Sequence, residues 1–133
     1  MSYFVDTNYF LRFLLRDNDQ QFNEVEKLFL GAAEGKAELF SSTIVFFELY
    51  WVLSSYYGKD ERGLVDLLLK ILELEYIVFD EREDLYRSLE IFQKESVDLE
   101  DSYNLTQALR KGASELKTFD KKLLKLYQKS LRK

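Results

Sequence analysis

Apolar residues along this chain follow two alternating periods, which predict strands and helices in turn. Short β-branched or aromatic runs predict strands at 3–5, 38–41, 76–79 and 116–118. Apolar residues spaced three or four positions apart predict helices over about 9–16, 22–32, 43–57, 64–72, 81–94, 98–112 and 120–127. Strands that alternate with helices need crossover connections, so we expect an α/β fold with a mainly parallel sheet and helices on both faces. No linker or repeat interrupts the pattern, and we expect a single domain over residues 1–133.

The first predicted strand, which we expect to be buried on both faces, stops at Asp6. A carboxylate therefore lies where a strand meets a helix, and ligands of parallel sheets bind at the carboxyl ends of strands. The simpler interpretation is that Asp6 or Thr7 caps the helix that follows. Taken alone, Asp6 favours the cap, but other carboxylates in the chain change that balance.

The composition limits the chemistry that this chain can perform. The 133 residues include no cysteine and no histidine, which excludes disulfides, thiolate sites, Ser–His–Asp catalysis and most transition-metal sites. Catalysis must then use carboxylates, lysine, hydroxyls or a hard metal ion bound by oxygen. The sequence shows neither a signal peptide nor a long uncharged apolar stretch, so we expect a cytoplasmic protein with no membrane span.

Glu48 is the most informative candidate, because residues 44–53 around it are apolar on nearly every side of a predicted helix. An ionised carboxylate buried without partners costs several kcal/mol or becomes protonated. The alternative is a buried glutamate paired with an arginine.

Three further aspartates stand at predicted helix starts. Asp98 and Asp101 lie three residues apart, and Asp120 follows the fourth predicted strand as Asp6 follows the first. Helix capping explains Asp98 well, whereas for Asp120 its position favours capping and a site role equally. Asp101 shares a face with apolar residues, and we expect the helix N-terminus to lower its pKa.

Asp6, Glu48, Asp101 and Asp120 together would repel one another if they converged at the end of a parallel sheet. A bound Mg²⁺ or Mn²⁺ removes this repulsion, because these cations prefer carboxylate oxygens and water. The chemistry that such a site suits is metal-assisted hydrolysis of a phosphodiester bond.

These residues resemble the PIN-domain family, and within it the VapC-type toxin ribonucleases of toxin–antitoxin pairs. The matching stretches are Phe4-Val5-Asp6-Thr7-Asn8, Glu48 in its apolar helix, Asp98-x-x-Asp101 and Thr118-Phe119-Asp120. The resemblance implies a three-layer α/β/α sandwich with four to five strands. It also implies a metal-dependent endoribonuclease that is usually a homodimer and is held silent by a cognate antitoxin. By the same resemblance, the acidic quartet is Asp6, Glu48, Asp101 and Asp120, of which Asp6 and Asp101 would hold the metal, with Thr7, Asn8, Asp98 and Thr118 in support.

Other classes remain open at this stage. A phosphate-accepting receiver domain would need an aspartate ending a central strand, for which Asp80 is the candidate. A haloacid-type phosphatase would need a second aspartate where this chain has Asn8. Within the resemblance, an RNA-processing nuclease without an antitoxin and a PIN-like binding module without activity are the alternatives.

Charge and aromatic residues point to partners. The net charge is −5, yet residues 110–133 carry nine Lys/Arg against two Asp/Glu. This asymmetry predicts RNA binding by Lys121, Lys122 and Lys125; the alternative is that the last helix is simply solvated.

Large aromatic side chains on several predicted helices, among them Phe10, Phe13, Phe46 and Trp51, are more than one buried helix face needs. We expect them to form a homodimer interface and a groove for an antitoxin segment; a single aromatic core is the alternative.

Overall fold

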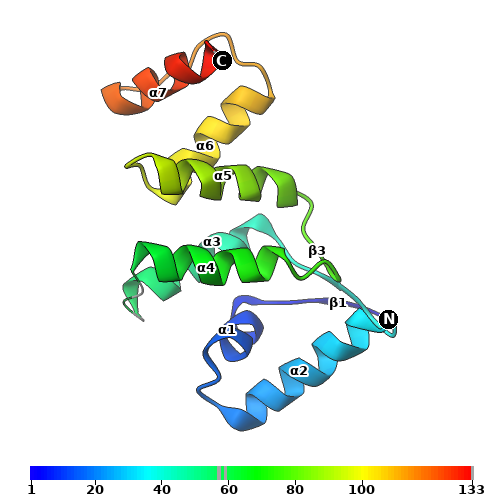
Figure 1. Ribbon diagram of the computed structural model, residues 1–133. Helices are drawn as coiled ribbons and strands as arrows, with labels where there is room; N and C mark the ends of the chain where they lie inside the picture. Colours follow the sequence, from blue (N-terminus) through cyan, green and yellow to red (C-terminus); the bar gives the residue numbers. More distant parts are fainter. Residues whose placement is uncertain (57, 59, 133) are drawn as a thin grey trace. The chain divides into compact units, whose positions relative to one another are not determined.

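The computed structural model describes residues 1–56, 58 and 60–132, and the chain divides into two compact units, Met1–Arg82 and Glu83–Lys133. Figure 1 shows the elements of each unit. Among the described residues, the first unit contains three short strands and four helices, and the second unit contains helices. Each unit is described below by itself.

The three strands of the first unit form a parallel sheet, as predicted. They are β1 (Ser2–Phe4), β2 (Glu38–Phe40) and β3 (Ile77–Val78), in the order β1-β2-β3. Leu39 faces Tyr3 on one side and Ile77 on the other, and Phe40 likewise faces Phe4 and Val78. The sheet thus has β2 at its centre and β1 at one edge.

Burial differs between the two rows of the sheet. Leu39 of β2 and Ile77 of β3 are fully buried, but Tyr3 of β1 beside them is 41% exposed; Phe4, Phe40 and Val78 at the next position of each strand are 51%, 43% and 56% exposed. Phe4 packs edge-on against Phe40, with ring centroids 5.5 Å apart. The prediction that the first strand is buried on both faces is therefore wrong, because β1 lies at the edge of the sheet and its Phe4 row stays half exposed.

The described residues of the first unit also form four helices: α1 (Thr7–Leu15), α2 (Asp19–Ala33), α3 (Thr43–Ser55) and α4 (Glu61–Leu72). They pack as the pairs α1 with α2 and α3 with α4, and α1 also packs on α3. Their starts follow capping rules, since Asn18 and Ser42 accept hydrogen bonds from the backbone N–H groups of Gln21 and Val45. The predicted end of the third helix, Tyr57, lies outside the described residues.

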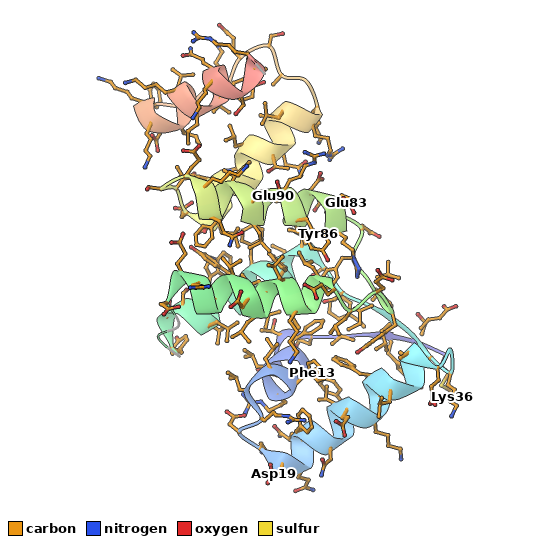
Figure 2. All side chains as sticks on the ribbon, viewed as in Figure 1. Phe13, Asp19, Lys36, Glu83, Tyr86 and Glu90 are labelled. Atoms are coloured by element: carbon orange, nitrogen blue, oxygen red, sulfur yellow. The ribbon has the colours of Figure 1, made fainter. Side chains whose placement is uncertain are left out.

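Several aromatic rings are buried in the core of this unit. Phe10 is fully buried; its ring stacks with Phe79 and lies tilted against Phe29, with both pairs of ring centroids 6.1 Å apart. Phe13 packs between Phe22 and Phe29. Phe13 is labelled in Figure 2, and the ammonium nitrogen of Lys70 on α4 lies over its ring, 5.4 Å from the ring centroid. A single aromatic core, the alternative considered above, thus accounts for many of these rings.

The second unit contains α5 (Arg82–Lys94), α6 (Leu99–Arg110) and α7 (Lys121–Leu131). Leu105 of α6 packs with Leu123 and Tyr127 of α7 to form its buried core. Residues 116–118 are not a strand, although the sequence predicts one there, and the described residues contain three strands rather than four or five. A short strand needs a neighbouring strand with which its backbone forms hydrogen bonds, and the described part of this unit contains helices but no strand that could pair with residues 116–118.

A buried polar network joins α5 to α6. Asp84, which is 6% exposed, accepts hydrogen bonds from Arg110 Nε at 2.9 Å and from Gln107 Nε2 at 3.0 Å. Ser88 and Thr106, both buried, meet at 3.3 Å beside it. Because a buried carboxylate is stable only when paired, these contacts fix how the two helices pack.

No helix in the described part of the chain combines the length and the apolar character that crossing a membrane requires.

Candidate active site

Asp6 lies at the junction that the sequence predicts, directly after β1 and at the N-cap of α1. Its carboxylate accepts a hydrogen bond from the backbone N–H of Thr7 at 2.7 Å. The preceding residue is held by the central strand, since the Val5 N–H donates to the Phe40 carbonyl at 2.9 Å and the Ser41 hydroxyl donates to the Val5 carbonyl at 2.8 Å. Asp6 itself is exposed, so its free oxygen faces solvent from a fixed backbone.

Thr7 is a buried residue with a hydroxyl group that lacks a hydrogen-bond partner within residues 1–56, 58 and 60–132. A buried hydroxyl group without a hydrogen-bond partner destabilises the folded state. Its place beside Asp6 agrees with a supporting role at a polar site, whereas Asn8, the third residue of the motif, is exposed.

Asp6 also lines a groove of 640 Å³ in the first unit, together with Tyr3, Phe4, Tyr9 and nearby residues of α2. The Tyr9 hydroxyl donates a hydrogen bond to the Glu24 carboxylate. This hydrogen bond, assisted by burial and by the negative charge of Glu24, raises the pKa of Tyr9. Tyr9 was not predicted from the sequence as a site residue, and its spacing of three from Asp6 is the signal that was available.

Glu48 is less enclosed than its apolar neighbourhood predicts. Its neighbours Phe47 and Leu49 are buried, but Glu48 is half-buried, and Ile44 and Trp51 on its face are 63% and 43% exposed. Within the described residues Glu48 forms no ion pair, so the alternative of a buried Glu–Arg pair gains no support. The helix is apolar all round, and packing rather than sequence decides which of its faces is covered.

The aspartates of the second unit are organised by helix capping. Asp98 caps α6 by accepting the N–H of Asp101 at 2.8 Å, and Asp120 caps α7 by accepting the N–H of Leu123 at 3.0 Å. Thr118 in turn accepts the Asp120 N–H at 3.0 Å, which fixes the backbone at this cap. The capping interpretation is therefore correct for Asp6, Asp98 and Asp120, and each of them retains carboxylate oxygens for a ligand.

Asp101 lies in the first turn of α6 near the other two acids of this unit. Burial raises the pKa of Asp101, and the negative charges of Asp98 and Asp120 raise it further. The predicted lowering of its pKa by the helix N-terminus is wrong, because desolvation and two like charges outweigh the helix dipole. The second unit thus brings Asp101 within electrostatic reach of Asp98 and Asp120.

No group of three or more acidic side chains in the described residues is arranged as a ready metal-binding cluster. The predicted site residues are distributed over both units, with Asp6, Thr7, Asn8 and Glu48 in the first and Asp98, Asp101, Thr118 and Asp120 in the second.

Comparison with family models adds the decisive observation, because the model of the PIN domain matches residues 3–129. This chain belongs to the PIN domain family. PIN domains are generally metal-dependent nucleases, so family membership supports a nuclease function. The matched residues of this PIN domain extend over both units and include every residue predicted for the site. Searches of curated proteins and of solved structures give no match.

Proposed function

We propose that this PIN domain is a Mg²⁺- or Mn²⁺-dependent endoribonuclease that hydrolyses RNA phosphodiester bonds. The observation that carries the proposal is the family match over residues 3–129, which contains the four predicted acids in order. The proposal assigns Asp6, Glu48, Asp101 and Asp120 to the catalytic quartet, with Asp6 and Asp101 as metal ligands.

The donor chemistry of these residues fits a hard divalent cation. All candidate ligands are oxygen atoms, which Mg²⁺ and Mn²⁺ prefer. The raised pKa of Asp101 reflects burial first and then the like charges of Asp98 and Asp120, and a cation would neutralise these charges. The unpartnered hydroxyl of Thr7 offers a further oxygen beside Asp6. When bound, the cation supplies the Lewis acidity that phosphodiester hydrolysis requires.

The protein's own contribution in this proposal is to hold each carboxylate in place. The Ser41 hydroxyl and β2 fix the strand end before Asp6, and Thr118 fixes the backbone of Asp120. Asp98 anchors the Asp101 N–H and thereby the first turn of α6. Fixed ligands keep the geometry of a metal site without reorganisation during the reaction.

The experiment is cleavage of a labelled single-stranded RNA and of the matching DNA by the purified full chain, with Mg²⁺, with Mn²⁺ and with chelator. We expect metal-dependent cleavage of the RNA that is lost in Asp6→Asn and in Asp101→Asn. Asp66→Asn, which changes an exposed aspartate of α4 outside the proposed site, is the matched control and should cleave normally. Full cleavage in chelator, or in either site variant, would contradict the proposal.

The proposal extends to the toxin of a toxin–antitoxin pair, with an antitoxin and a second copy as partners. Ile44 and Trp51 of α3 are the exposed large residues that support an apolar contact surface. We expect a homodimer by sedimentation at tens of micromolar protein, and we expect a cognate antitoxin peptide to block cleavage. A monomer whose cleavage no neighbouring gene product inhibits would instead indicate a stand-alone RNA-processing nuclease.

A further inference from the structure

Helix α7 carries a one-sided row of lysines that we call the lysine face, made of Lys121, Lys122, Lys125 and Lys129. At 3.6 residues per turn these four positions lie within an arc of about 100°. All four are exposed, and the opposite side of the helix carries Leu123 and Tyr127, which are buried in the core of the second unit. The helix is therefore anchored by one side and presents four ammonium groups on the other.

The lysine face borders a shallow groove of 380 Å³, with Leu126 as its apolar wall. The segment Lys121–Leu131 contains no acidic residue. Glu95 approaches Lys129, with the ammonium nitrogen and a carboxylate oxygen 3.9 Å apart, and Lys122 donates a hydrogen bond to the Ser96 carbonyl. At this distance and exposure an ion pair is weak, so the lysine face keeps most of its positive charge.

The lysine face begins at the proposed catalytic end of the helix. Asp120 is the N-cap of α7, Lys121 follows it directly, and Lys129 lies eight residues further on. This distance corresponds to about 12 Å along the helix axis. The positive charges thus form a line that leads away from a proposed catalytic carboxylate.

We propose that the lysine face is a phosphate-binding track for the part of an RNA strand that flanks the bond to be cut. This inference rests on the proposed function, and it adds Lys129 and the track's direction to the RNA binding that the sequence predicts for Lys121, Lys122 and Lys125. A line of like charges on a protein of net charge −5 matches a polyanion whose charges are also arranged in a line. Lysines contact phosphates as point charges, so the track should hold the strand without reading its sequence.

The track is tested by the salt dependence of binding. Anisotropy of a labelled single-stranded oligoribonucleotide, titrated in chelator with the full chain, gives the affinity at several salt concentrations. Because each phosphate contact on a single strand contributes about −0.7 to the slope of log K against log salt, Lys125→Gln/Lys129→Gln should make the slope less negative by about 1.4. The control is Lys111→Gln/Lys117→Gln, which makes the same charge change in the same unit at two exposed lysines outside the lysine face.

A third variant should act in the opposite direction. Glu95→Gln removes the carboxylate near Lys129 and should tighten binding at low salt. Equal slopes for the Lys125/Lys129 and Lys111/Lys117 variants would overturn the proposal, because the protein would then bind RNA through net charge alone. Variant-sensitive binding of an acidic peptide without binding of RNA would also overturn it, because the face would then fit an acidic protein.

The same variants separate this inference from the proposed function. At low RNA concentration, Lys125→Gln/Lys129→Gln should cleave more slowly than the wild type, and the difference should narrow as the RNA concentration rises, because the loss is in binding. If the wild-type chain binds RNA through the track but never cleaves it with any divalent metal, the nuclease proposal fails while the track stands.

Discussion

Asp120 offers the sharpest separation of a structural role from a catalytic one, since it is both the N-cap of α7 and a proposed catalytic acid. Its carboxylate accepts the Leu123 N–H at 3.0 Å, and Leu123 belongs to the core of the second unit. Asp120→Asn keeps a carbonyl oxygen for this hydrogen bond, whereas Asp120→Ala removes the cap. We therefore expect the alanine variant to lose about 1 kcal/mol of unfolding free energy and the asparagine variant much less.

The loss of charge in Asp120→Asn has two opposing effects on stability. The helix N-terminus favours a negative charge by about 0.3–1 kcal/mol, but the charge of Asp120 also repels Asp101. These effects offset one another in part, so the asparagine variant should unfold close to the wild type. In thermal unfolding followed by circular dichroism, the alanine variant should melt about 3–5 °C lower.

Cleavage should respond differently from stability. Both Asp120 variants should lose RNA cleavage, because neither retains the carboxylate. Asp60 is a matched control, since it caps α4 by accepting the Gly63 N–H at 2.8 Å and has no proposed catalytic role. Asp60→Ala should lower the melting temperature similarly and keep cleavage. An Asp120→Asn variant that is stable and fully active would refute the reasoning and leave Asp120 as a cap only.

Two further predictions concern the second unit. Because the pKa of Asp101 is raised, its ionised form destabilises the folded state, so Asp101→Asn should melt higher than wild type in chelator at neutral pH. This advantage should shrink as the pH falls toward 3.8, the ordinary value for aspartate, and a constant difference at all pH values would contradict it. In urea unfolding, Arg110→Gln should cost about 2 kcal/mol or more, because it leaves the buried Asp84 charge short of a partner. Asp84→Asn should lower the free energy of unfolding by about 1 kcal/mol, since the half-exposed Arg110 returns to water. A larger loss for Asp84→Asn than for Arg110→Gln would contradict this interpretation of the network.

Local interactions account for what could be predicted from the sequence. The apolar runs of β1, β2 and β3 and the caps at Asp98 and Asp120 can be recognised from residues within a few positions, and the structure has these elements as predicted. The fourth strand was not found at 116–118, since a strand depends on a partner that periodicity does not reveal.

Properties that depend on distant residues were less predictable. The helix-dipole argument for Asp101 omitted the burial of its side chain and the charges of Asp98 and of the distant Asp120, and therefore gave the wrong direction for its pKa. Glu48 lies on a helix that is apolar all round, so its half-exposed position follows from packing alone. The Asp84–Arg110 pair, with partners on two helices, had no signal in spacing.

The assignment of Asp6 and Asp101 as metal ligands is tested most directly by binding of Mn²⁺ to the purified chain. Titration followed by electron paramagnetic resonance counts free Mn²⁺ without any dependence on substrate. The account predicts saturable binding by the wild type and by Asp66→Asn, and strongly weakened binding by Asp6→Asn and by Asp101→Asn, with all four proteins folded. Wild-type binding by either site variant, or no saturable binding by the wild type, would contradict the assignment.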